Sequence, residues 1–377
     1  MSLSKKMSND KAKRIVVKVG TSALTDADGA LDRSLIRNLT QQLASQFNAG
    51  NQVALVTSGA IRAGMERLNM KSRPKSMPEK QAAAAVGQGL LMQIYTELFD
   101  EAGVTAAQVL LTRDDFSDRK RYLNARNTLH TLLSLNAIPV INENDTVATD
   151  EIKIGENDTL AALVAAAIGA DLLVLLSDVP GLYDTRAHSP NKGMVVPEVR
   201  KIGRDILAMA GGTNGLAGTG GMKTKIEAAR IAMCSGVIMV IADGRAPGIL
   251  AEVADEKPVG TRFLPDECSL NSKKRWIAFG MPVRGTVHVN EGARLMLLEK
   301  GKSLLSAGVV DVAGNFQTGD LLAIADETGN CFARGFVNYS AAELRLIKGR
   351  RSDEIEDILG YKDFDEVIHR DNMVIGV

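Results

Sequence analysis

Short apolar runs alternate with longer segments of helical periodicity over most of the chain. The run from Arg14 to Gly20 is rich in β-branched residues and ends in glycine, which predicts a buried parallel strand. Between residues 31 and 47 apolar side chains recur at helical spacing, and Gly50 is a suitable stop signal. The chain therefore begins with a strand that is followed by a helix.

The same alternation continues to about residue 255. Further strands are expected at 53–57, 106–111, 138–142, 171–177 and 237–241, and helices at 78–102, 121–136, 159–169 and 226–233, with a short one after Pro247. Alternating strands and helices predict an open, mainly parallel α/β sheet with helices on both faces. Because such sheets bind ligands at the carboxyl ends of their strands, polar residues at these ends are candidates for a site.

The pattern changes after residue 257. Three prolines interrupt the next stretch, which predicts an irregular connector. From residue 283 short alternating runs are divided by glycines, which predicts a small, mostly β, barrel-like domain. The expected division is an α/β domain at 14–257, a linker at 258–282, a small domain at 283–361 and a tail at 362–377.

Composition narrows the class of protein. The 45 basic and 45 acidic residues give a formal net charge of zero, so no overall field steers the chain to nucleic acid or to a membrane. Three widely spaced cysteines indicate neither a disulfide framework nor a zinc site and fit a reducing cytoplasm. The apolar runs are too short or too rich in alanine to span a membrane, and no signal peptide is apparent. We therefore expect a cytoplasmic protein with no membrane partner.

The stretch from Gly218 to Lys225, GTGGMKTK, is the strongest candidate for chemistry and runs into the helical pattern at 226–233. Its glycines let several N–H groups converge, the helix behind them adds a positive dipole, and two lysines add charge. One interpretation is an anion cradle that binds phosphate, and the other is a flexible surface loop. The Gly-x-x-x-x-Gly-Lys-Ser/Thr motif is absent, so a nucleotide site here is not a Walker A loop.

Other strand ends carry polar residues of the same kind. Lys18, near the end of the first strand, either snorkels past an edge or is held toward an anion, and we favour the second. Ser58 either caps the following helix or helps to bind a carboxylate. The segments 143–145 and 155–158 contain more polar side chains than are needed to cap a helix, so we expect functional groups there. One crevice could collect Lys18, Ser58, Asp145, Asn157, Asp158, Asp178 and Lys225.

The histidines bear on the type of reaction. All four, at positions 130, 188, 288 and 369, lie outside the candidate turns, so no general base is evident. Phosphoryl transfer needs charge neutralisation, alignment and usually magnesium. A hydroxyl acceptor must lose a proton, whereas a carboxylate, with a reference pKa of about 4.3, is already an anion at neutral pH. The pattern therefore leans toward formation of an acyl phosphate.

Six motifs, in order, resemble the amino acid kinase family over residues 14 to about 255. They are KVGTS at 18–22, VTSGA at 56–60, INENDTV at 141–147, GEND at 155–158, LSDVPGLY at 176–183 and GTGGMKTK at 218–225. Their wording is similar to the branch of the family that phosphorylates L-glutamate. Ile154 departs from the pattern, because an aromatic residue is expected there, and it affects packing more than chemistry. The segments 285–293, 302–309, 314–320 and 333–339 resemble a PUA domain.

The resemblance implies ATP-dependent phosphorylation of the L-glutamate side-chain carboxylate to L-glutamyl 5-phosphate, the first step of proline synthesis, with Mg²⁺. It implies that Lys18 and Lys225 flank the transferring phosphoryl group and that Asp158 orients them. The residues implied for ATP are Lys18, Ser177, Asp178, Thr219, Gly220, Gly221, Met222, Lys223, Thr224 and Lys225. Those implied for glutamate are Ser58, Asp145, Asn157 and, as a weaker candidate, Asn142. No residue is assigned as a direct metal ligand.

The family also implies feedback inhibition by proline, which would compete at the glutamate site, and assembly into homodimers or tetramers. Two alternatives stay open. The first is another amino acid kinase that acts on aspartate, acetylglutamate, carbamate or a nucleotide. The second is an RNA-binding or RNA-modifying protein, since PUA domains often serve that purpose. Residues 283–377 hold 11 basic and 15 acidic residues, a net charge of 11 − 15 = −4, which disfavours RNA except at the cluster Arg345, Lys348, Arg350 and Arg351.

Overall fold

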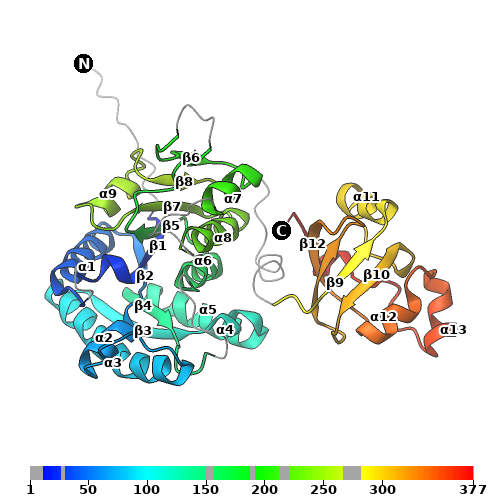
Figure 1. Ribbon diagram of the computed structural model, residues 1–377, viewed down its shortest axis with the longest axis horizontal. Coiled ribbons are helices and arrows are strands. Elements are labelled where there is room, and N and C mark those ends of the chain that lie inside the picture. The colour runs from blue at the N-terminus through cyan, green and yellow to red at the C-terminus, as the bar shows by residue number, and fades with distance from the viewer. Residues whose placement is uncertain are drawn as a thin grey trace, which may run out of the picture. The chain divides into compact units, whose positions relative to one another are not determined.

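The structure is a computed structural model that describes residues 12–26, 30–148, 156–186, 192–211, 221–265 and 282–376. The chain divides into two compact units, one built on an eight-stranded sheet and the other on a five-stranded sheet (Figure 1). Across the described ranges, we find no helix that is both long and apolar enough to cross a membrane.

The large sheet has the strand order β3-β4-β2-β1-β5-β7-β8-β6. Its strands are β1 (Arg14–Val19), β2 (Gln52–Val56), β3 (Thr105–Leu111), β4 (Ala137–Glu143), β5 (Leu172–Ser177), β6 (Glu198–Val199), β7 (Ile238–Asp243) and β8 (Thr261–Phe263). From β3 to β7 all neighbours are parallel, which confirms the predicted mainly parallel sheet. Only β8 is antiparallel to its neighbour β7, and it pairs in parallel with the short β6.

Strand β8 lies within 258–282, where the sequence predicts an irregular linker. The structure corrects this expectation, because residues 261–263 form three paired positions with β7. A glycine just before this strand has a packing role. Gly260 has a φ of +71°, and a Cβ atom there would lie 2.0 Å from the carbonyl oxygen of Ile241, so only glycine lets the backbone come this close.

Nine α-helices lie in the described part of residues 12–265. They are α1 (Arg33–Asn48), α2 (Ala60–Arg67), α3 (Met77–Glu101), α4 (Arg113–Ser117), α5 (Arg119–Ser134), α6 (Glu156–Ile168), α7 (Arg204–Gly211), α8 (Gly221–Cys234) and α9 (Ile249–Ala254). Two of them, α1 and α3, start with side-chain caps. Asp32 accepts hydrogen bonds from the backbone N–H groups of Ser34 and Leu35 at the start of α1, and Ser76 forms a capping box with Glu79 at the start of α3.

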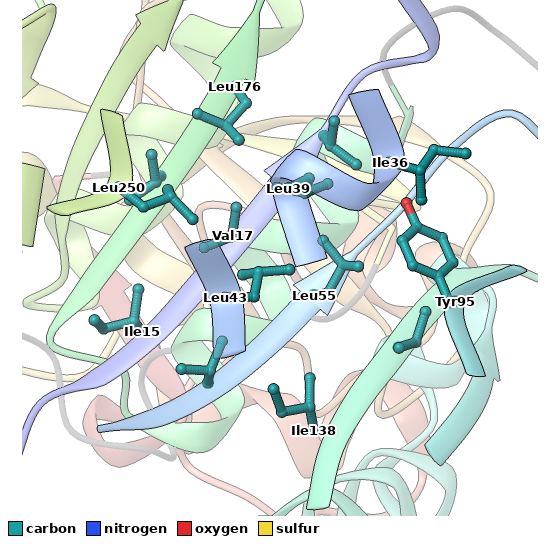
Figure 2. Packing of buried hydrophobic residues seen from close by; sticks show 14 of the residues in the cluster. Ile15, Val17, Ile36, Leu39, Leu43, Leu55, Tyr95, Ile138, Leu176 and Leu250 are labelled. Atoms are coloured by element: carbon teal, nitrogen blue, oxygen red, sulfur yellow. The ribbon is translucent and has the colours of Figure 1, made fainter. Parts of the chain in front are cut away.

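Strand β1 separates the core from the candidate site. Ile15, Val17 and Val19 pack with Leu39 and Leu43 of α1 in the core cluster. Figure 2 labels Ile15, Val17, Leu39 and Leu43. Because successive side chains of a strand point to opposite faces, Lys18 lies on the other face. That face is covered by α6, which packs against β1 and against α8. The alternation along β1 therefore turns Lys18 toward the helix that carries Asp158.

Helices α2 and α3 pack backbone to backbone. A Cβ atom at Gly64 would lie 1.7 Å from the carbonyl oxygen of Ala83, and one at Gly87 would lie 1.8 Å from that of Ala60. Neither position can hold a side chain unless the helices move apart. The two glycines therefore fix the middle of α3 against the first turn of α2.

The second unit contains β9 (Gly285–Val289), α11 (Glu291–Lys300), β10 (Val309–Gly314), β11 (Leu321–Ala325), β12 (Cys331–Phe336), α12 (Ala341–Ile347), α13 (Ile355–Leu359) and β13 (Met373–Ile375). Its sheet has the order β10-β9-β11-β12-β13, with β9 and β11 parallel and the other pairs antiparallel. Val287, Ile324, Tyr339 and Leu344 are among its core residues. The predicted small, mostly β domain is confirmed, but β13 lies in 362–377, so part of the expected tail belongs to the sheet.

Candidate active site

Asp158, in the first turn of α6, bridges two lysines that come from different elements. Its Oδ1 lies 2.6 Å from Lys18 Nζ of β1, and its Oδ2 lies 3.0 Å from Lys225 Nζ of α8. The Asp158 side chain is 0% exposed, and those of Lys18 and Lys225 are 7% and 11% exposed. One carboxylate against two ammonium groups leaves a local charge of +1, which suits an incoming anion.

The pKa values of this cluster follow from burial and mutual charge. Burial lowers the pKa of Lys18 below its ordinary value of 10.5, and the charge of Lys225 adds to this, while Asp158 opposes it. Burial by itself would raise the pKa of Asp158, but Lys18 and Lys225 outweigh it and hold that pKa below 3.8. Asp158 is therefore an anion at neutral pH and serves as a counter-ion, not as a base.

The first turn of α8 explains which lysine reaches Asp158. The helix begins at Gly221, earlier than the predicted 226, so both lysines of the motif are helical. Residues two apart on a helix face different directions. Of the two lysines in the motif, Lys225 is the one that is paired with Asp158. The Thr224 hydroxyl also donates to Asp158 Oδ2, over 2.9 Å. The Lys223 side chain passes close to Gly211, 3.6 Å from where a Cβ atom would be placed.

Asn157 organises the opposite side of the site. Its Nδ2 lies 2.8 Å from the carbonyl oxygen of Thr57, 2.9 Å from Ser58 Oγ and 3.1 Å from Asn142 Oδ1. Three predicted acceptor-binding residues, Ser58, Asn142 and Asn157, are thus brought into one hydrogen-bonded group. The fourth, Asp145, is 9% exposed in the turn after β4, three residues beyond Asn142.

Ser58 does not cap α2. The N-cap of α2 is Gly59, with a φ of +104° that favours glycine, and no side chain caps this helix. Ser58 instead accepts from Asn157, which leaves its hydroxyl hydrogen able to donate. The structure thus rules out the capping role of Ser58, and its role in binding a carboxylate stays a prediction.

Ser177 is the last residue of the central strand β5, and Asp178 follows it, on the other side of β1. The Ser177 hydroxyl donates to Asp178 Oδ1 over 3.1 Å. Asp178 is exposed and lies near enough to Lys18 for its charge to raise the pKa of that lysine. The structure therefore places both predicted nucleotide-side residues at the strand edge that carries Lys18. Thr219 and Gly220, as well as Ile154, lie outside the described residues.

Helix α3 contributes three polar residues that the sequence reasoning missed. Gln81 Nε2 donates to the carbonyl oxygen of Ala148 over 3.2 Å, Gln88 Oε1 accepts from Asn142 Nδ2 over 2.7 Å, and the Tyr95 and Thr57 hydroxyls are 2.8 Å apart. Burial raises the pKa of Tyr95, so its hydroxyl stays protonated. The signal was their seven-residue spacing, which places them on one stripe of an alanine-rich helix.

An open, mainly parallel α/β sheet with a lysine of β1 and a lysine of α8 held around a buried aspartate of α6 suits the class of proteins that bind and transfer phosphate. The amino acid kinase family model matches residues 13–243, and the PUA domain model matches residues 285–359. The chain belongs to the amino acid kinase family, which confirms the resemblance that the six motifs predict.

Curated relatives resemble the chain over almost its whole length. It is 52% identical over 362 residues to a glutamate 5-kinase of Caldanaerobacter subterraneus subsp. tengcongensis, covering 96% of this chain and 97% of that protein. It is 49% identical over 364 residues to a glutamate 5-kinase of Moorella thermoacetica, covering 97% and 96%. The structure of carbamate kinase from Giardia lamblia bound to AMP-PNP is 17% identical with a TM-score of 0.50, covering 68% of this chain and 99% of that one, so it shares the fold.

Proposed function

We propose that the protein is an ATP-dependent kinase that phosphorylates the side-chain carboxylate of L-glutamate, giving L-glutamyl 5-phosphate and ADP. The observation that carries this proposal is the buried Asp158 carboxylate, which holds Lys18 and Lys225 together beside the hydrogen-bonded group around Asn157. The relatives that are glutamate 5-kinases at 49% and 52% identity support glutamate as the acceptor.

The reaction needs no general base. A glutamate carboxylate oxygen attacks the γ-phosphorus of ATP, the bond from that phosphorus to the bridging oxygen breaks, and ADP leaves with the electron pair. The attacking carboxylate, with a reference pKa of about 4.3, is already ionised. Lys18 and Lys225 neutralise charge on the transferring group, and Asp158 keeps both ammonium groups in place without accepting a proton.

The nucleotide would lie along the ends of β5 and α8. Ser177, Asp178 and the segment from Thr219 to Lys225 would hold it, with the start of α8 directed at the phosphates. Magnesium would be carried chiefly by phosphate oxygens, as is usual for this ion. Among the described residues no group of three or more acidic, histidine or cysteine side chains could hold a metal, and the exposed Asp178 is suited to contact the ion or one of its waters.

Glutamate would lie on the Asn157 side. Ser58 with the uncapped N–H groups of α2 suits a carboxylate, and the buried carboxylate of Asp145 suits the ammonium group. Proline carries the same two groups on its α-carbon, so we infer competitive feedback inhibition at this place, as suits the first enzyme of proline synthesis. We further infer a cytoplasmic enzyme that forms dimers or tetramers.

RNA binding by the second unit is less well supported. Of its four clustered cationic residues, Lys348 pairs with Asp311 at 2.9 Å, and Arg345 donates to the carbonyl oxygen of Gly314 at 2.5 Å. Arg351 lies 3.6 Å from Asp353. Three of these cations already have partners on the protein, so fewer remain for phosphate groups.

Trapping of the acyl phosphate as a hydroxamate tests the proposed function. The purified chain, supplied with ATP and Mg²⁺, should form hydroxamate with L-glutamate, and L-proline should suppress the signal competitively. Aspartate, N-acetylglutamate and carbamate, assayed in parallel, should give far lower kcat/KM values. Preference for any of these acceptors over glutamate would overturn the assignment.

A further inference from the structure

The polar stripe of α3 contains one side chain with an unused hydrogen-bond donor. Gln81 and Tyr95 direct their polar groups to Ala148 and Thr57. Gln88, midway between them, uses only its oxygen, which accepts from Asn142. Within the described ranges no partner is found for Gln88 Nε2, and the side chain is partly exposed. An amide that is fixed at one end and open at the other is suited to bind a ligand.

The direction of the Gln88 amide is fixed by a backbone group. The N–H of Glu143 can only donate, and it lies 2.9 Å from Asn142 Oδ1, so that atom must be the oxygen. Asn142 Nδ2 must then face Gln88, which has to accept with Oε1 over 2.7 Å. Gln88 therefore presents its NH₂ group away from Asn142.

The same reasoning extends to the far end of the chain of amides. Because Asn142 Oδ1 is an acceptor, Asn157 must offer its Nδ2, which also reaches Ser58 Oγ. Ser58 is then an acceptor in that bond and keeps its own hydrogen to donate. A chain of uncharged groups thus ends in a donor on each side, the hydroxyl of Ser58 and the amide of Gln88. Two outward donors with no acidic group between them fit a carboxylate.

Helix packing keeps Gln88 in this place. The preceding residue, Gly87, touches the carbonyl oxygen of Ala60 so closely that no Cβ atom fits. The backbone of Gln88 is therefore held beside the first turn of α2, where uncapped N–H groups favour negative charge.

The order of residues indicates which end of the substrate Gln88 meets. Asn157 adjoins Asp158, which holds the two lysines, and the hydrogen-bond chain continues from Asn157 through Asn142 to Gln88. Gln88 therefore lies at the end of this chain that is remote from phosphoryl transfer. We propose that Gln88 is a further substrate-binding residue whose amide NH₂ donates to the α-carboxylate of the acceptor amino acid. This inference rests on the proposed function, since it assumes an amino acid acceptor.

Two substitutions at Gln88 separate substrate binding from mere support of Asn142. Gln88→Glu keeps an oxygen for Asn142 Nδ2 but replaces the donor with a negative charge, whereas Gln88→Ala removes both groups. We expect the KM for glutamate to rise about 10- to 100-fold in both variants, with Gln88→Glu at least as impaired, because hydrogen bonds to charged groups are strong. The kcat and the KM for ATP should stay within about threefold, since uniform substrate binding is lost. Gln93→Ala, an exposed position on the same helix, is the matched control.

A Gln88→Glu variant with a wild-type KM for glutamate would show that Gln88 only positions Asn142, and it would overturn the proposal. An equal fall in kcat for both variants with no change in the KM for glutamate would do the same. Thermal melting confirms that each variant is folded. The hydroxamate assay is first run on the wild type. A wild type without activity on glutamate would contradict the proposed function. The inference about Gln88 is tested only by comparing the variants with an active wild type.

Discussion

Replacing Asp158 by asparagine tests the central ion cluster most directly. The side chain keeps its size but loses its charge, while Lys18 and Lys225 remain 7% and 11% exposed. Removing one partner of a buried ion pair costs about 3–5 kcal/mol, because the remaining charge is left without compensation. We therefore expect the free energy of unfolding to fall by about 3–5 kcal/mol at pH 7, unless one lysine becomes neutral in the variant.

The pH dependence shows which of these occurs. Lys18 already has a lowered pKa because it is buried, and Asp158 is the group that raises it. Without Asp158 the pKa of Lys18 falls further, and activity that needs its charge is lost as pH rises through this lower value. The alkaline limb of kcat/KM for ATP, which reports the free enzyme, should move to lower pH.

The stability difference between wild type and variant has its own pH window. The pKa of Asp158 is lowered in the folded state, so its contribution is fully present above its ordinary pKa of 3.8 and is lost as pH falls through the folded value. Urea unfolding at pH 7 and at pH values below 3.8 measures this loss. Asp114→Asn, at an exposed position of α4, is the control. Wild-type stability at pH 7 together with an unmoved alkaline limb would refute the argument.

Two further substitutions test the site and its framework. Lys225→Ala should lower kcat about 100- to 1,000-fold, as loss of one preorganised donor to a transition-state anion does, while calorimetry should show that ATP still binds. Lys201→Ala, at an exposed position, is the control. Near-normal turnover of Lys225→Ala would remove the role assigned to Lys225. Gly87→Ala should destabilise the protein by about 3 kcal/mol through overpacking, because its Cβ atom would meet Ala60. Gly89→Ala has open space at the Cβ position and should instead stabilise by about 0.5–1 kcal/mol in denaturant unfolding; similar results for both glycine variants would contradict the packing argument.

The parallel part of the sheet was predictable because a strand buried on both faces reads as an apolar run. Strand β5 is the clearest example, with all six residues buried. Strands β8 and β6 have only three and two residues, too few to show a period. In addition, Gly260 is required by its contact with Ile241, a residue of β7 that no local pattern around Gly260 indicates.

The charged part of the site was predictable, and part of the polar support was not. A lysine in a buried strand is costly, so the sequence alone makes Lys18 a candidate for a functional role. The sequence gives no such signal for Gln88, because glutamine is common on the solvent-exposed face of an alanine-rich helix. Its partner, Asn142, lies 54 positions away, and only the close packing of α2 with α3 shows which face of the helix meets the strand ends.

Adjacent residues at the start of α6 would serve the two halves of the proposed site. Asn157 contacts Ser58 on the proposed acceptor side, and Asp158 contacts Lys18 and Lys225 on the proposed nucleotide side. One peptide bond thus sets the spacing between the two halves, so a shift of α6 that improves the fit to one substrate necessarily moves the groups that receive the other. Coupling between ATP binding and acceptor binding would then need no conformational change in the core, because both substrates contact the same helical turn.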